Sequence, residues 1–187
     1  MMEIIIKPTE ITRENFALYG DLISSDAIKP IDINEGYAKR FDNLAKINTS
    51  KDKGETVLSI FSALKRSFPM RIDMMEKHPL GSQAFVPMKE TIFLSFVAPP
   101  GDAPEINKIR SFIIPPKMGI NYKPGIWHFP LISTEDTDFL VIDRKGSGNN
   151  LITHKFNNNF HFFDLLTIFL SEVFLFKYAA CKEHLSG

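Results

Sequence analysis

The stretch Asn121-Tyr-Lys-Pro-Gly-Ile-Trp-His-Phe-Pro-Leu131 decides the fold, together with the earlier stretch Glu76-Lys-His-Pro-Leu-Gly-Ser-Gln-Ala-Phe85. Each stretch sets a histidine among turn-forming Pro and Gly residues and then runs back into apolar, strand-like sequence. Inward and outward side chains alternate along a β-strand. The two stretches therefore predict a small β-barrel that presents imidazoles at its mouth.

Short apolar runs punctuated by Pro and Gly fill the chain from residue 56 onward. They predict strands over residues 57–64, 70–76, 83–87, 92–98, 109–114, 119–122, 126–131 and 138–143. Strands of this length and spacing are typical of an all-β sandwich or barrel. The predicted fold class is therefore all-β with a minor helix.

The N-terminal segment predicts a strand followed by a helix. Residues 3–7 are rich in β-branched side chains, and residues 12–19 read as a helix with a threonine cap, ended by Gly20. Residues 21–24 predict a return strand. Residues 25–53 are rich in Asn, Asp and Lys with little periodicity, which predicts a long irregular excursion.

Composition limits the class of protein. A chain of 187 residues with 44% apolar side chains predicts one domain with an appendage rather than two domains. Positive and negative side chains number 22 each, so the net charge indicates neither nucleic acid nor a membrane as a partner. The lone Cys181 cannot form an internal disulfide, and residues 1–7 lack the features of a secretory signal. We therefore expect a cytoplasmic protein.

The C-terminal segment differs in texture from the rest. We expect residues 1–156 to form the catalytic domain and residues 157–187 to form an atypical Phe-rich tail. Residues 160–181 are as long as a membrane span but include Asp164, Glu172 and Lys177. Each buried charge costs roughly 2.5–3.5 kcal/mol at bilayer depth. We therefore expect a C-terminal helical extension packed on the body or on a second subunit.

The two histidine stretches contain candidate metal ligands. Alternation places Glu76 and His78 on one face of a strand, and Gln83 and His128 can lean into the same cavity. Imidazole and carboxylate suit Ni, Mn, Fe or Zn, although an amide is a poorer ligand. An alternative remains open, in which Glu76 is solvated and the histidines hydrogen-bond or pack within the structure.

The sequence Pro124-Gly125-Ile126-Trp127-His128 resembles the second motif of cupins, and Glu76-x-His78 followed by Gln83 resembles a degraded first motif. The chain as a whole resembles the ureidoglycolate lyase family over about residues 4–150. The segments that match are His78-Pro-Leu-Gly-Ser-Gln-Ala-Phe85, Asn121-Tyr-x-x-Gly-x-Trp-His-x-Pro-Leu131, Phe16-x-x-Tyr-Gly-Asp21, Asn34-x-Gly, Arg40-Phe41, Ser59-Ile-Phe61 and Asp138-Phe-Leu-Val-Ile-Asp-Arg144.

This resemblance implies a cupin-like double-stranded β-helix barrel and a homodimer. It also implies cleavage of (S)-ureidoglycolate to glyoxylate and urea in allantoin and purine catabolism, with Ni²⁺ as the cofactor. The family normally closes with a short acidic strand, whereas this chain continues into the Phe-rich tail. The tail is either a lineage-specific extension or a frameshifted reading of the gene.

Ureidoglycolate is a carbinolamide, so its cleavage needs a base for the C2 hydroxyl, an acid for the leaving nitrogen and a cation for the carboxylate. We expect His128 as the acid–base residue, His78 as ligand or orienter, and Arg40 as the carboxylate clamp. The residues expected to bind substrate are Ser82, Gln83, Asn121 and Tyr122.

Three other functions remain open on the sequence. The chain could be a noncatalytic cupin-like protein that binds a small carboxylate. The tail could anchor the barrel to a membrane. A different metal-dependent lyase or isomerase acting on a related hydroxy acid also fits, because one fold hosts many reactions.

Overall fold

The computed structural model describes residues 2–26, 28–156 and 160–163. Strands make up most of it. The strands are β1 (Met2–Ile5), β2 (Thr9–Glu10), β3 (Gly20–Ile23), β4 (Ile31–Ile33), β5 (Ala38–Arg40), β6 (Glu55–Ala63), β7 (Met74–Lys77), β8 (Gln83–Pro87), β9 (Phe93–Ala98), β10 (Arg110–Ile114), β11 (Gly119–Tyr122), β12 (Trp127–His128), β13 (Ile132–Ser133), β14 (Thr137–Lys145), β15 (Ile152–Lys155) and β16 (Phe160–Phe163). The helices are α1 (Arg13–Phe16) and the short 3-10 turns η1 (Asn34–Gly36), η2 (Lys51–Lys53) and η3 (Ile106–Lys108).

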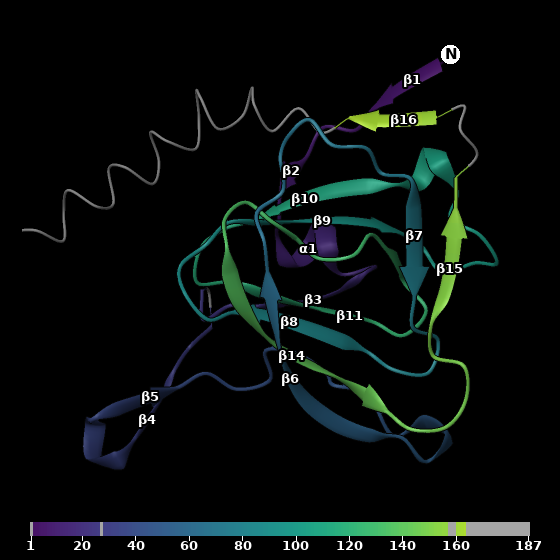
Figure 1. Ribbon diagram of the computed structural model, residues 1–187. Coiled ribbons are helices and arrows are strands. Elements are labelled where there is room, and N and C mark those ends of the chain that lie inside the picture. The colour runs from purple at the N-terminus through teal and green to yellow at the C-terminus, as the bar shows by residue number, and fades with distance from the viewer. Residues whose placement is uncertain (1, 27, 157–159, 164–187) are drawn as a thin grey trace, which may run out of the picture.

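Two sheets form the body of the barrel (Figure 1). One runs in the order β15-β7-β12-β9-β10-β2, with β13 also paired to β9. The other runs in the order β3-β11-β8-β14-β6. Strands far apart in the chain are neighbours in both sheets, which confirms the all-β, cupin-like barrel predicted from the sequence.

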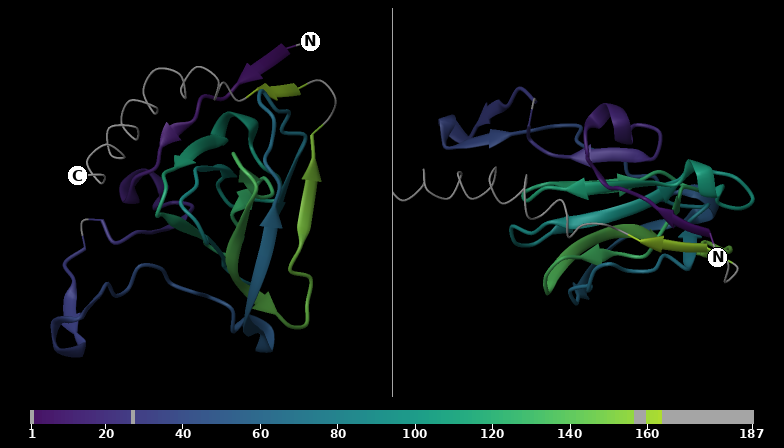
Figure 2. Two further views of the ribbon diagram at one scale, coloured as in Figure 1. Left: turned by 60° about the vertical axis from the view of Figure 1, so that its left-hand side comes forward. Right: turned by 90° about the horizontal axis from the view of Figure 1, so that it is seen from above.

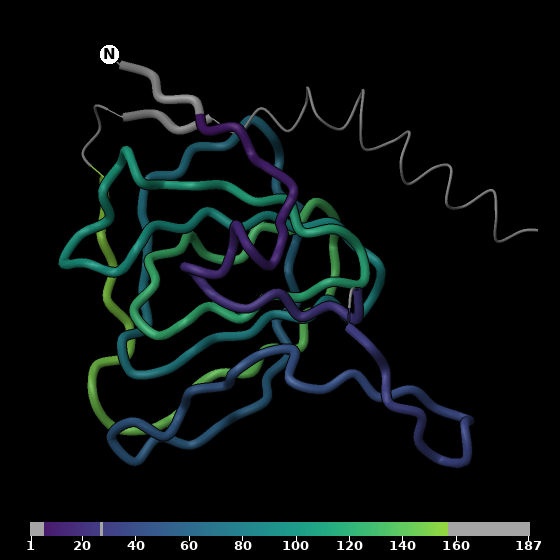
Figure 3. Tube along the Cα trace, turned by 180° about the vertical axis from the view of Figure 1, so that it is seen from behind, coloured from purple at the N-terminus to yellow at the C-terminus, as the bar shows by residue number. Residues whose placement is uncertain are grey.

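The N-terminal segment joins the two sheets along one side. β2 extends the first sheet by pairing with β10, and β3 extends the second by pairing with β11. Helix α1 lies between them, and its Phe16 is fully buried against Phe112 and Tyr122. Seen from behind, this segment runs across the outside of the barrel (Figure 3). The N-terminal segment therefore covers that side of the barrel.

Apolar side chains pack on both faces of the first sheet. In β9, Phe93 and Val97 face the core between the sheets, whereas Leu94 and Phe96 face a second core on the outer side. A strand that is buried on both faces reads as a continuous apolar run, as β9 does. The barrel therefore has a doubly buried sheet and a more exposed one.

The β4–β5 hairpin stands off from the body in both views of Figure 2. Its strands pair only with each other among the described elements. Residues 25–53 were expected to be irregular, so the hairpin corrects that expectation. The positive φ angles of Asn34 and Glu35, 53° and 57°, close its turn, as Asn in particular allows.

Several other boundaries differ from the prediction. The helix begins after Thr12, which forms a capping box with Asn15 as expected, but it ends at Phe16 rather than at Gly20. The predicted strand 126–131 shortens to β12, because the Pro130 ring cannot donate to a ladder. Strands β13 and β15 were not predicted.

The C-terminal expectation is partly wrong. Residues 160–163 form β16, a strand that pairs in parallel with β1, rather than the start of a helix. The rest of the expected helical extension lies outside the described residues. The expected boundary between residues 156 and 157 falls where the described residues stop. Within the described part of the chain, no helix is long and apolar enough to span a membrane.

Candidate active site and metal centre

The two histidine stretches meet through the backbone. The N–H of Gly125 donates to the carbonyl oxygen of His78 over 2.9 Å. Gly125 has a φ of 80°, in the left-handed region that favours glycine. The Pro124-Gly125 turn therefore fixes one histidine stretch against the other.

The inward rows of both sheets become polar at one end of the barrel. On the first sheet Glu76 is the cross-strand neighbour of His128, and His78 follows at the end of β7. On the second sheet Tyr122 pairs with Gln83. Continuing the β8–β14 register by one step places Asp143 opposite Gln83. Polar side chains from both sheets therefore converge.

Glu76, His78 and His128 form a compact triad. Their ligand atoms all lie within 4.8 Å of one another. The rings of His78 and His128 are 5.2 Å apart between centroids, and His128 Nε2 lies 3.7 Å from Glu76 Oε1. Glu76 and His78 thus point to one centre, as strand alternation predicted, although β7 ends at Lys77 and His78 lies just beyond it.

Backbone carbonyls set the tautomers of both histidines. His78 Nδ1 lies 2.7 Å from the carbonyl oxygen of Asn150, and His128 Nδ1 lies 3.1 Å from that of Ile126. A carbonyl only accepts, so each Nδ1 carries the proton and each Nε2 offers a lone pair. Both Nε2 atoms are buried and find no hydrogen-bond partner among the described residues.

Burial disfavours charge in this triad. Desolvation lowers the pKa of His128 to about 3, with a smaller contribution from His78 in the same direction. Desolvation raises the pKa of Glu76, and His78 partly opposes that rise. A neutral imidazole beside a half-buried carboxylate has no hydrogen-bond donor to offer it, which favours the binding of a cation between them.

The residues present fit a divalent metal ion. Two Nε2 lone pairs and one carboxylate converge, and each imidazole is oriented by a backbone carbonyl in the manner of metal-bound histidines. Imidazole and carboxylate ligands suit borderline ions such as Zn, Ni, Mn and Fe. The geometry supports a cation site, and it does not distinguish among these ions.

Tyr122 packs against His128 of the triad. Its ring stacks on His128, with centroids 4.4 Å apart and planes 16° apart. Its hydroxyl lies 2.8 Å from Ser95 Oγ, and the side chain is buried. Tyr122 was expected to offer a hydroxyl to substrate, but that hydroxyl points into the core.

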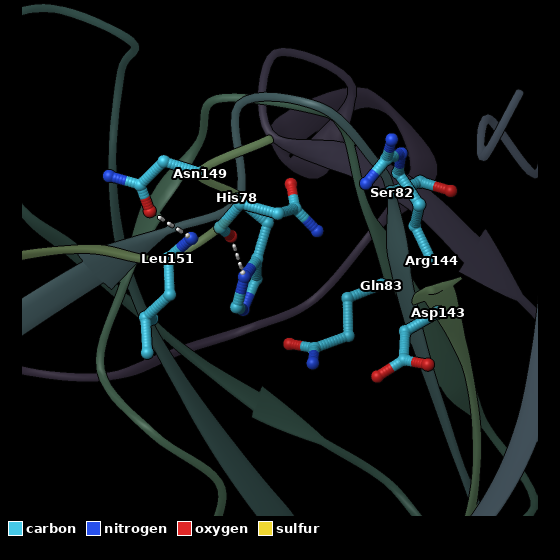
Figure 4. A pocket seen from close by; sticks show the side chains of 8 residues that line it. His78, Ser82, Gln83, Asp143, Arg144, Asn149 and Leu151 are labelled. Atoms are coloured by element: carbon cyan, nitrogen blue, oxygen red, sulfur yellow. Dashed lines mark hydrogen bonds between the residues drawn. The ribbon is translucent and has the colours of Figure 1, made fainter. Parts of the chain in front are cut away.

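A cavity of about 320 Å³ opens beside His78 (Figure 4). It is lined by His78, Ser82, Gln83, Asp143, Arg144, Asn149, Asn150 and Leu151. In Figure 4 Gln83 and Asp143 lie next to each other on the side of the cavity away from His78, and the amide end of Gln83 extends toward His78. The cavity and the triad share His78 and form one site.

Arg40 is not brought to this site. It lies on β5 in the projecting hairpin, where its Nε is 3.0 Å from Asp42 Oδ1 and its side chain is 56% exposed. The cation that lines the cavity is Arg144, which is buried. Arg40 is therefore away from the triad of its own chain, because the hairpin that carries it pairs only with itself among the described elements.

Asn121 is also turned away from the cavity. Its amide donates to Asp21 Oδ2 and to the carbonyl of Lys46 over 2.9 and 3.1 Å. It sits between two inward residues of β11, Ile120 and Tyr122, and so faces the other side of the sheet. Asn121 therefore fastens the excursion to the barrel.

Ser82 does line the cavity, but its hydroxyl also accepts the N–H of Asn48 over 2.8 Å, while its own N–H donates to Asn48. The neighbouring Gln83 is buried, and its Oε1 has no hydrogen-bond partner within the described chain. Of these two, Gln83 has the free polar atom.

Sequence reasoning missed Asp143 and Asn150. Asp143 continues the inward row of Phe139 and Val141, so strand alternation could have found it. Desolvation raises its pKa, while hydrogen bonding with Gln83 and the nearby His78 lower it. Asn150 lies in a loop between β14 and β15, and no sequence signal marks its carbonyl as the partner of His78.

Comparisons with known proteins identify the family to which the chain is similar. The family model named Ureidoglycolate lyase matches residues 3–162. The chain is 43% identical over 155 residues to a ureidoglycolate lyase of Pseudomonas paraeruginosa (strain DSM 24068 / PA7), spanning 82% of this chain and 92% of the relative.

Two further relatives carry the same name. Identity is 44% over 157 residues with the protein of Pseudomonas syringae pv. syringae (strain B728a), spanning 83% and 91% of the two chains. It is 42% over 160 residues with that of Pseudomonas fluorescens (strain SBW25), spanning 85% and 95%. The similarity therefore covers the barrel and nearly the whole of each relative.

Proposed function

The chain belongs to the ureidoglycolate lyase family, and we propose that it cleaves (S)-ureidoglycolate to glyoxylate and urea in allantoin and purine degradation. The observation that carries this proposal is the convergence of Glu76, His78 and His128 beside this cavity. A site of this size and polarity suits a small, polar, anionic guest.

The proposed reaction is an elimination without redox change. The C2 hydroxyl loses its proton, its oxygen becomes the carbonyl of glyoxylate, and the bond from C2 to the ureido nitrogen breaks. That nitrogen takes up a proton, and urea departs. The protein needs to supply proton transfer and orientation, and no covalent nucleophile is required.

We propose Glu76, His78 and His128 as the ligands of a divalent cation, with Ni²⁺ as the family-implied ion. When bound, the ion supplies Lewis-acid polarisation of the substrate oxygens. Gln83 was a tentative fourth ligand. Its place beside Asp143 on the cavity wall favours a role toward the substrate instead.

For proton transfer, the structure favours Glu76 over His128. His128 is 2% exposed and stacked on Tyr122, with a pKa lowered to about 3, whereas the Glu76 side chain is 20% exposed. Such an imidazole is a weak base near neutrality. Oε1 of Glu76 lies toward His128 and the proposed cation position, so its Oε2 can accept the proton of the C2 hydroxyl and return it to the ureido nitrogen.

Arg144 replaces Arg40 as the proposed carboxylate partner. Its Nε and NH2 groups donate to the carbonyls of Lys51, Asp52 and Ser147. Its NH1 is buried and has no hydrogen-bond partner among the residues described. A guanidinium held in this way can bind a carboxylate with little further loss of entropy.

We further propose a cytoplasmic homodimer. The single cysteine supports a reducing compartment. The edge strand β6 carries the largely exposed Leu58 and Ile60 on its outer face, next to Leu140 and Ile142 of β14. An apolar strip on a sheet edge suits a second copy of the chain.

Product analysis on the purified protein tests the proposed reaction. Incubation with racemic ureidoglycolate should release equal amounts of glyoxylate and urea and leave one enantiomer behind, with metal content measured on the same sample. Release of ammonia in place of urea, or binding without turnover, would contradict the proposal and favour a hydrolase or a carboxylate-binding protein.

Matched histidine variants locate the chemistry. His128→Ala should abolish urea release while the circular dichroism spectrum is retained. His154→Ala removes an imidazole that contacts Trp127 and Phe156 outside the triad, and it should retain activity. Equal activity in the two variants would remove the triad from the reaction.

A further inference from the structure

The second sheet presents hydrogen-bond acceptors to the cavity. Gln83 and Asp143 both lie on inward rows, since Gln83 shares its row with Phe85 and Asp143 shares its row with Val141. Their strands pair in the register Val141↔Phe85 and Ile142↔Ala84, so the two polar residues are cross-strand neighbours. Both side chains line the cavity (Figure 4).

Gln83 and Asp143 place an amide oxygen and a carboxylate side by side on this wall of the cavity. An amide oxygen and a carboxylate both accept hydrogen bonds. The amide oxygen of Gln83 is buried and is one of the unpartnered acceptors in the described structure.

We propose that Gln83 and Asp143 form an acceptor pair that recognises the terminal ureido N–H groups of the substrate. This inference rests on the proposed function and deepens it by assigning a specificity-determining role to Asp143. The Gln83 oxygen accepts one N–H, and the Asp143 carboxylate accepts another. The opposite wall supplies His78 of the triad, so the guest lies with its ureido end on the second sheet.

The pair discriminates between guests because a guest without N–H donors would leave its acceptor atoms without hydrogen bonds. A guest with a methyl group in place of the terminal NH₂ would bury the Gln83 oxygen and the Asp143 carboxylate without donors. Sites built to hydrogen-bond an N–H reject analogues that lack it far more strongly than apolar pockets reject a size change. The site should therefore distinguish a ureido group from an acetamido group of the same shape.

Two unreactive compounds test this selection on the purified protein. N-carbamoylglycine keeps the carboxylate and the ureido group of the substrate but lacks the C2 hydroxyl. N-acetylglycine has a methyl group in place of the terminal NH₂. Calorimetric titration of the wild-type protein should give at least roughly tenfold tighter binding of N-carbamoylglycine.

Variants assign the selection to the pair. In Asp143→Asn and Gln83→Met the affinity ratio should fall towards one, with binding of N-acetylglycine little changed. Asp138→Asn is the matched control, because Asp138 lies on the same strand but is exposed and contacts Ser62. It should keep the wild-type ratio.

The outcomes separate this inference from the proposed reaction. Equal affinities in the wild-type protein, no binding of N-carbamoylglycine, or an unchanged ratio in both folded variants would overturn the acceptor pair. The wild-type comparison needs no variant to fold. Absence of urea release with the binding ratio intact would instead overturn the lyase reaction and leave the acceptor pair standing.

Discussion

The buried imidazole of His128 makes stability depend on pH in a predictable direction. Its pKa is about 3 in the folded protein, against about 6.5 in an unfolded chain. Below pH 6.5 the unfolded state binds a proton that the folded state does not, so the free energy of unfolding falls as pH falls. The loss is absent above the unfolded pKa and continues to about pH 3.

The magnitude follows from the width of that window. At pH 5.0 the solution lies about 1.5 pH units below the unfolded pKa and still well above the folded one. At about 1.36 kcal/mol per unit, this costs about 2 kcal/mol relative to pH 7.5. For a domain of this size that corresponds to about 4–8 °C in melting temperature.

The assay compares metal-free wild-type protein with His128→Gln, using chemical denaturation at pH 7.5 and at pH 5.0. Glutamine does not titrate, so the variant should lose about 2 kcal/mol less than the wild type between the two pH values. Other titrating groups and the fixed effect of the substitution largely cancel in this double difference. Equal losses in the two proteins would refute the inference that the fold holds His128 neutral.

Three further predictions concern the metal centre, the sheet and the hairpin. Glu76→Gln should weaken Ni²⁺ binding at least roughly tenfold in calorimetric titration, because a neutral amide is a poorer ligand than a carboxylate. The control is Glu90→Gln at an exposed site, which should not weaken binding. Equal affinities of the two variants would exclude Glu76 as a ligand. Gly20→Ala should lower the free energy of unfolding by more than about 2 kcal/mol, because the added Cβ would lie 2.0 Å from the Asn121 carbonyl oxygen. The control is Gly101→Ala, whose added Cβ meets nothing closer than 3.5 Å. Similar losses of stability in the two variants would contradict the β3–β11 packing. Arg40→Ala should leave kcat/KM for ureidoglycolate within about twofold, since its exposed pair with Asp42 contributes little; a large loss would show that the hairpin reaches an active site.

Strand periodicity and turn residues account for how well the barrel was predicted. β8 and β11 begin and end where the alternation of apolar side chains and the neighbouring turns placed them. The same alternation put Glu76 and His78 on one face. These features depend on residues a few positions apart, where steric and hydrogen-bonding preferences act directly.

Predictions that required partners distant in sequence were less successful. Arg40 was expected at the site because its charge suits a carboxylate. The hairpin that carries Arg40 makes no contact with the core, so nothing holds this residue near the cavity of its own chain. Asn121 was expected there because it lies next to Tyr122, although neighbours on a strand face opposite sides. Asp143 was missed although strand alternation places it in the row of Phe139 and Val141, because the cavity that it lines forms only where remote segments meet.

The sequence by itself determined the strand-rich fold, the turns and the chemical identity of the triad, since these depend on local geometry and on which side chains are present. Only the tertiary structure decided that Glu76, His78 and His128 share one centre, that backbone carbonyls turn both Nε2 atoms toward it, and that Asp143 lies beside Gln83. Those outcomes depend on the pairing of strands that are remote in the chain. Burial between two sheets then removes water from polar groups that would otherwise be solvated, and this desolvation gives the site its chemistry.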